Sequence, residues 1–195
     1  MSTRLTRRLI ATVLTLALVP ASASARASVS DWKDLGDDRG VVVLMRHAIA
    51  PGGGDPADFR LGDCRTQRNL SNEGRAQARR IGQQIRVSGV DITGVLSSPW
   101  CRSRDTARLL GVGDVRTRGY LGSTFTAPPR IAAVRESRTR QLIEAHRGRE
   151  GILIVVGHYA NIMDLTGLAT GSGEGIAVRV NGDGELDVIG RLPAP

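Results

Sequence analysis

The stretch Val41-Val42-Val43-Leu44-Met45-Arg46-His47 decides the fold. Its first five residues are apolar and three of them are β-branched, which indicates a strand buried on both faces, as in a parallel sheet. A cation and an imidazole follow directly at the carboxyl end of this strand. Open α/β sheets bind their ligands beyond the carboxyl ends of the strands, so this end is a candidate functional site.

Two further strand ends carry residues of the same kinds. The apolar run at 92–96 leads into Ser97-Ser98-Pro99-Trp100-Cys101-Arg102, and the run at 152–156 leads into Gly157-His158. An arginine at such an end can bind an anion through two N–H groups at once. If the three strands are neighbours in one sheet, the residues expected to converge are Arg46, His47, Arg102 and His158.

Helical and extended patterns alternate along the rest of the chain. Helices are expected at 71–89, 100–110, 131–146 and 162–168, loops at 51–56 and 111–130, and a closing hairpin at 176–189. With 41% hydrophobic and 24% charged residues, the chain is neither a disordered protein nor a multi-pass membrane protein. The alternation predicts an α/β fold, a three-layer α/β/α sandwich with a largely parallel central sheet.

Residues 1–25 are typical of a secretory signal peptide. Arg4, Arg7 and Arg8 precede an apolar run at 9–19, and Ala23-Ser24-Ala25 provides a cleavage site. The run is too short to span a bilayer, although an uncleaved anchor is the alternative. We therefore expect a single mature domain at 26–195, with no membrane span, in the periplasm or secreted.

Export bears on the charge and on the cysteines. Cleavage removes three arginines and lowers the formal net charge from +8 to +5. Because no nucleic-acid recognition motif accompanies this charge, we expect no nucleic-acid partner.

Cys64 and Cys101 are the only cysteines in the sequence. In an oxidising compartment they are expected to form a disulfide, with two unpaired thiols as the alternative. Metal-ligand spacing is absent, so no metal is expected.

In four segments the chain resembles the histidine phosphatase superfamily, the phosphoglycerate mutase-like proteins. The family's Arg-His-Gly signature is matched by Arg46-His47-Ala48, and its late strand-end histidine by His158. The Ser-Ser-Pro-x-x-Arg-x-x-x-Thr-Ala segment is matched by Ser97-Ser98-Pro99, Arg102, Thr106 and Ala107. The start of a family helix is matched by Leu70, Ser71, Gly74, Gln77 and Ala78.

The resemblance implies a phosphatase that works through a phosphohistidine. His47 would accept the phosphoryl group. Arg46, Arg102 and His158 would hold its oxygens and stabilise the charge that builds on them during transfer. The resemblance implies hydrolysis of a phosphomonoester without a cofactor. The alternative is a catalytically weak module that binds phosphate or interacts with the cell envelope.

Several positions depart from the family pattern. Ala48 replaces the signature glycine, which is a change between small residues. Ala50 and Gly53 stand where the mutase-like branch has Thr and Asn, which argues against a sugar-phosphate mutase. Tyr159 follows the second histidine, where the phytase branch has Asp.

The general acid of the family pattern has no assigned residue in this sequence. Ser123 stands where the mutase-like branch carries a glutamate, so another carboxylate is needed if the leaving group is to be protonated. Glu174, in the loop before the last hairpin, is the first candidate. Glu136 and Asp55 are ranked below it, and each of the three has a solvated surface position as its alternative.

The segment at 63–71 resembles exported bacterial histidine phosphatases similar to lipopolysaccharide core heptose phosphatases. Arg60, Arg65 and Arg68 are expected to line the entrance of the pocket and to attract an anionic substrate. A solvated basic loop is the alternative. The expected partner is a phosphorylated small molecule or envelope glycan.

Overall fold

The computed structural model describes residues 31–36 and 38–195. The signal peptide expected at 1–25 therefore lies outside the described residues. Within the described part of the chain, none of the helices has the length and apolar character needed to cross a membrane.

Six strands form one sheet in the order β3-β2-β4-β1-β5-β6. The strands are β1 (Val42–Arg46), β2 (Ile92–Ser97), β3 (Val115–Thr117), β4 (Ile152–Gly157), β5 (Gly175–Val180) and β6 (Leu186–Leu192). The pairs β1–β4, β2–β4 and β2–β3 are parallel, whereas β5 is antiparallel to both β1 and β6. The predicted largely parallel sheet is confirmed. The prediction of a continuous loop at 111–130 is wrong, because β3 is an edge strand too short to show a periodic pattern.

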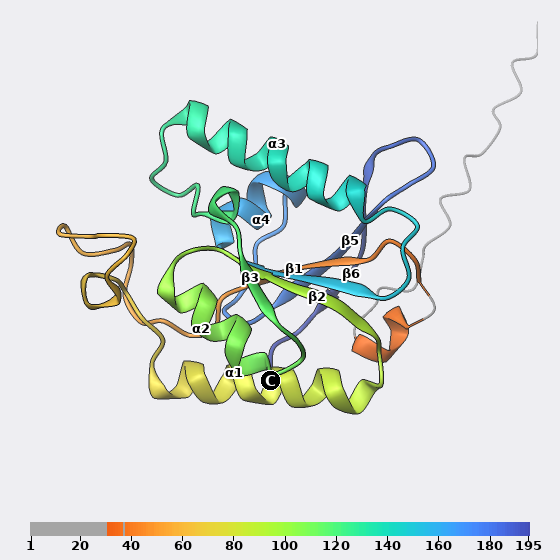
Figure 1. Cartoon of the computed structure of the whole chain (residues 1–195), viewed down its shortest axis with the longest axis horizontal. Coiled ribbons are helices and arrows are strands. Elements are labelled where there is room, and N and C mark those ends of the chain that lie inside the picture. The colour runs from red at the N-terminus through yellow and green to blue at the C-terminus, as the bar shows by residue number, and fades with distance from the viewer. Residues whose placement is uncertain (1–30, 37) are drawn as a thin grey trace, which may run out of the picture.

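Helices cover both faces of the sheet (Figure 1), which confirms the predicted three layers. The α-helices are α1 (Asn72–Ser88), α2 (Cys101–Leu110), α3 (Pro129–Ala145) and α4 (Tyr159–Thr166), and three short 3-10 turns are η1 (Trp32–Leu35), η2 (Cys64–Thr66) and η3 (Gly119–Leu121). Helices α1 and α2 pack on one face, and α3 and α4 on the other. Helix α4 begins three residues earlier than predicted, directly after His158.

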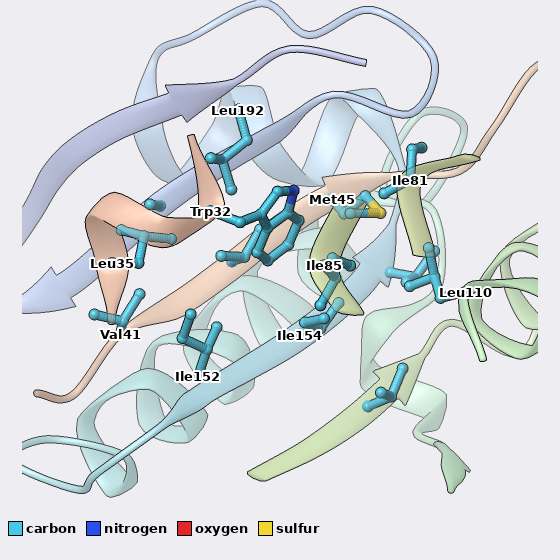
Figure 2. Close-up of a cluster of buried hydrophobic side chains, with 14 of the residues drawn as sticks. Trp32, Leu35, Val41, Met45, Ile81, Ile85, Leu110, Ile152, Ile154 and Leu192 are labelled. Carbon is cyan, nitrogen blue, oxygen red and sulfur yellow. The ribbon is translucent and has the colours of Figure 1, made fainter. Parts of the chain in front are cut away.

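Alternate residues of β1 face opposite layers, as a buried strand requires. Val43 and Met45 belong to the cluster that packs against α1, and Val42 and Leu44 to the cluster under α3 and α4. Figure 2 shows the first cluster, with Trp32 of η1 lying among the side chains that β1, α1 and β6 contribute. Because side chains pack against both faces of β1, the strand is held in place, and so are the residues at its carboxyl end.

Helix α1 packs closely against the segment that follows β1. Ser71 caps the helix, because its Oγ accepts a hydrogen bond from the N–H of Gly74 at 3.0 Å. A Cβ on Gly74 would lie only 2.0 Å from the carbonyl oxygen of Ile49, so this contact requires a glycine. The helix ends at Gly89, which has a left-handed conformation with φ of 73°.

Candidate active site

The sheet order places three strand ends side by side, because β4 lies between β1 and β2. Arg46 ends β1 and pairs with Gly157 of β4, and His158 follows that glycine. Arg102 lies in the first turn of α2, which begins four residues after the end of β2. The structure thus brings together Arg46, His47, Arg102 and His158, which all line one cavity of about 420 Å³.

The imidazole of His47 is held with one nitrogen available to a substrate. Its Nδ1 lies 2.8 Å from the carbonyl oxygen of Ala48, which can only accept, so Nδ1 carries the proton and Nε2 keeps its lone pair. The residue is only 2% exposed. Burial lowers the pKa of His47 to about 3, and the positive charge of Arg102 acts in the same direction. The imidazole is therefore neutral near pH 7.

His158 faces His47 across the cavity. The two ring centroids lie 5.6 Å apart with the rings nearly perpendicular. Nε2 of His158 is hydrogen-bonded to Oγ of Ser98 at 2.7 Å, so the end of β2 orients a side chain that follows β4. Burial lowers the pKa of His158 well below its ordinary value, and the neighbouring His47 contributes.

Three guanidinium groups surround the two histidines. Arg46 donates to the carbonyl oxygen of Thr170 at 2.7 Å, and Arg68 donates through Nε to the carbonyl oxygen of Gly54 at 2.9 Å. The Nε atoms of Arg46 and Arg102 are buried and have no hydrogen-bond partner among the described residues. A buried N–H without a partner is costly, and both arginine side chains belong to the lining of the cavity.

A second interaction connects the end of β1 to α2. The hydroxyl of Thr106 accepts a hydrogen bond from the N–H of Ala48 at 3.0 Å and donates one to the carbonyl oxygen of Arg102 at 2.8 Å. Thr106 is fully buried. This positioning role was not predicted from the sequence, although Thr106 stands in the quoted motif.

Asp55 is the one carboxylate among the described residues that line the cavity. It binds both terminal nitrogens of Arg102, at 2.6 and 3.2 Å, and accepts a hydrogen bond from Nε1 of Trp100 at 2.9 Å. Burial acts to raise the pKa of Asp55, but the hydrogen bonds from Arg102 and Trp100 outweigh burial and lower it. Asp55 is therefore ionised and tied to the arginine.

The structure does not place the first acid candidate, Glu174, in the cavity. Its Oε2 accepts from Arg191 at 2.7 Å and from the N–H of Gly171 at 2.9 Å, and it is absent from the lining residues. Glu136 pairs with Arg140 one turn along α3. Of the three acid candidates, only Asp55 extends into the cavity, whereas Glu174 binds within its own loop.

Of the three arginines expected at the pocket entrance, only Arg68 lines the cavity. The side chains of Arg60 and Arg65 both contact Asp63, and they are 68% and 90% exposed. For these two residues the structure agrees with the alternative, a solvated basic loop. Arg68 differs because its side chain folds back onto the carbonyl groups of Ala50 and Gly54.

The predicted disulfide between Cys64 and Cys101 is present, with the two Cα atoms 5.8 Å apart. It joins η2, in the loop between β1 and α1, to the first residue of α2. The N–H of Cys101 also donates to the side chain of Gln67 at 2.9 Å. The loop that carries Asp55 and Arg68 is therefore fastened to the helix that carries Arg102.

Residues 42–117 match the family model described as "Histidine phosphatase superfamily (branch 1)". This segment contains β1, α1, β2 and α2, and with them His47 and Arg102. Over this segment the chain is therefore similar to the histidine phosphatase superfamily. The comparison with curated proteins found no match.

Solved structures share the fold. An open reading frame of Mycobacterium tuberculosis has a TM-score of 0.57 at 19% identity, covering 76% of this chain and 94% of its own. A phosphoserine phosphatase mutant of Entamoeba histolytica in complex with phosphoserine has a TM-score of 0.56 at 15% identity, covering 77% and 95%. The protein histidine phosphatase SixA complexed with tungstate has a TM-score of 0.55 at 17% identity, also covering 77% and 95%.

Proposed function

We propose that the protein is a phosphatase that hydrolyses a phosphomonoester through a phosphohistidine on His47. One observation carries the proposal: two neutral imidazoles and three guanidinium groups surround a single cavity at the carboxyl ends of three adjacent strands. The cations attract a phosphate dianion, and the neutral His47 is ready to attack it.

The reaction has two steps. Nε2 of His47 attacks phosphorus, a P–N bond forms, and the P–O bond to the leaving group breaks with its electron pair going to that oxygen. A water molecule then attacks phosphorus, the electron pair of the P–N bond returns to Nε2, and phosphate departs. The leaving oxygen takes up one proton, so the products are the alcohol or phenol and inorganic phosphate.

The surrounding residues stabilise charge on the transferred group. Arg46 and Arg102 both line the cavity, and their positive charges offset the charge that develops on its oxygens. His158 lies beside His47, and Ser98 fixes its orientation. Asp55 holds Arg102 in place through both of its carboxylate oxygens.

The solved relatives support the class of reaction. One is a protein histidine phosphatase and another is a phosphoserine phosphatase, so the shared fold serves phosphatases with different substrates. We take the substrate here to be a phosphorylated small molecule or envelope glycan, as in the exported bacterial subgroup that the segment at 63–71 resembles.

We also propose that the protein acts in the periplasm or is secreted. The signal-peptide pattern at 1–25 is the main support. The disulfide between Cys64 and Cys101 is a second, since such bonds persist in oxidising compartments.

A module that binds phosphate without turnover is the second candidate. The carboxylate at the cavity favours it, because an ionised Asp55 tied to Arg102 cannot donate a proton to a leaving group. Such a module would keep the arginine cluster but show no steady release of phosphate.

The test is phosphate release from a panel of phosphomonoesters by the purified mature protein. We expect turnover that His47→Ala abolishes and that Arg102→Ala or His158→Ala lowers at least ~100-fold, the scale for losing one transition-state donor. Arg65→Ala is the control, because that arginine is exposed and outside the cavity. Folded His47→Ala protein with a tenth of the wild-type activity would contradict the proposal.

A further inference from the structure

Aromatic side chains are rare in this chain and are concentrated at the candidate site. The sequence has only six Phe, Trp and Tyr residues, and four of them line the cavity: Phe59, Trp100, Phe125 and Tyr159. We propose that these residues form a subsite for an aromatic leaving group, so that aryl phosphomonoesters are the preferred substrates. This inference rests on the proposed phosphatase function and specifies its substrate class.

One wall of the subsite is rigid and reaches the reacting centre. The rings of Phe59 and Trp100 are stacked, with centroids 5.4 Å apart and planes 21° apart. Trp100 is fixed by its hydrogen bond to Asp55, and its ring meets that of His158 edge-on at 5.3 Å. A leaving group bound against Trp100 therefore lies close to His158.

The other aromatic residues come from different parts of the chain and are open to solvent. Phe125 precedes α3 and is 71% exposed, and Tyr159, the first residue of α4, is 39% exposed. The guanidinium of Arg46 lies over the Tyr159 ring at 5.6 Å, so this ring adjoins the anion-binding groups. Exposed aromatic surface next to a polar cavity is stabilised when an apolar ring covers it.

The chemistry of the site favours the same class of substrate. The one carboxylate of the lining is ionised and bound to Arg102, so the leaving oxygen must depart without a proton from it. A phenol has a pKa of about 10, so phenolate is a far weaker base than an alkoxide and departs more readily. As the P–O bond breaks, the electron pair goes to the phenolate oxygen, which then takes a proton from water.

The affinity of the subsite for an aromatic group can be measured without turnover, by binding non-hydrolysable phosphonates to the full mature chain. We expect benzylphosphonate to bind about fivefold more tightly than propylphosphonate, which is the scale of one aromatic contact. Phe125→Ala should remove most of this difference, and Phe125→Leu should not restore it. Val134→Ala is the matched control, because Val134 is an exposed apolar residue of α3 outside the cavity.

Equal binding of the two phosphonates by the wild type would overturn the inference, as would full recovery in Phe125→Leu, which would show an aliphatic subsite. In either case turnover that depends on His47 would leave the phosphatase proposal standing. Conversely, a preference for benzylphosphonate without phosphate release from any ester would support the aromatic subsite while contradicting the phosphatase proposal.

Discussion

At the scale of single residues, burial sets the chemistry of the two histidines. An imidazole in water is partly protonated near pH 6.5, and a protonated ring has no lone pair with which to attack phosphorus. His47 and His158 lie in a cavity whose lining is rich in arginine, and both effects favour the neutral form. The protein thus keeps its candidate nucleophile unprotonated below neutral pH.

The same burial makes stability depend on pH. The unfolded chain binds a proton to each histidine below about pH 6.5, whereas the folded chain does not do so until pH approaches the lowered pKa, about 3 for His47. The contribution of these neutral histidines to the free energy of unfolding is therefore fully present above pH 6.5, and it is lost as the pH falls toward their lowered pKa. We expect each such histidine to lower the free energy of unfolding by about 1.4 kcal/mol per pH unit in this range.

Urea unfolding between pH 4 and pH 7 tests this expectation. His47→Asn removes one titrating group, so the slope of the unfolding free energy against pH should decrease in the variant. His146 also has a pKa lowered by burial and remains in both proteins, so it does not affect the difference between them. Parallel slopes for the wild type and the variant would contradict a neutral buried His47.

The sequence alone could not identify the carboxylate that lines the cavity. Glu174 and Asp55 both stand in glycine-rich loops near strand ends, and no sequence pattern separates them. The choice depends on tertiary contacts: Arg191 of β6 binds Glu174, and Arg102 with Trp100 binds Asp55. The aromatic lining had no sequence signal either, because Phe59 and Phe125 lie in irregular segments with no periodic pattern.

At the scale of elements, the contact between α1 and the end of β1 positions the site. We predict that Gly74→Ala destabilises the protein by roughly 1–3 kcal/mol despite the better helix propensity of alanine, because its Cβ would meet the carbonyl oxygen of Ile49. Activity should fall as well, since Ile49 is only two residues from His47.

Thermal unfolding compares this variant with Gly62→Ala. A Cβ on Gly62 would meet no atom within 4 Å, so that change should alter stability by no more than ~0.5 kcal/mol. Similar melting temperatures for the two variants would show that α1 can move away from Ile49, contrary to the packing described.

The buried strands and the helices that follow them were predictable, because apolar runs and capping residues are local signals. The run at 41–45, the Ser71 cap and the end of the helix at Gly89 correspond closely to the observed elements. The edge strand β3 was missed because its three residues, Val-Arg-Thr, carry no periodicity. Local sequence patterns also do not show which strands are neighbours in the sheet. The convergence of the site residues depends on that strand order.

At the scale of the whole molecule, the disulfide stabilises the fold and the site together. It closes a loop with a sequence separation of 37 residues, for which chain entropy gives about 3–4 kcal/mol. We predict that reduction lowers the melting temperature by roughly 10 °C. Catalytic efficiency should also fall, because the loop that carries Asp55 and Arg68 would no longer be fastened to α2.

Calorimetry and activity measurements with and without reductant test this prediction. The double variant Cys64→Ser/Cys101→Ser should behave like the reduced wild type and should not respond to reductant. An unchanged melting temperature on complete reduction, verified by thiol alkylation, would contradict the predicted stabilisation, and unchanged activity would contradict the predicted effect on the site.

The central claim, covalent transfer to His47, is tested most directly by trapping the intermediate. Protein comprising residues 26–195 is mixed with a radiolabelled phosphomonoester, quenched within milliseconds in denaturant at alkaline pH, and digested for mass spectrometry. We predict an acid-labile phosphoryl group on Nε2 of His47, absent from His47→Ala and present in Arg65→Ala. Turnover of the ester with no labelled protein, or label on another residue that persists in His47→Ala, would contradict the account.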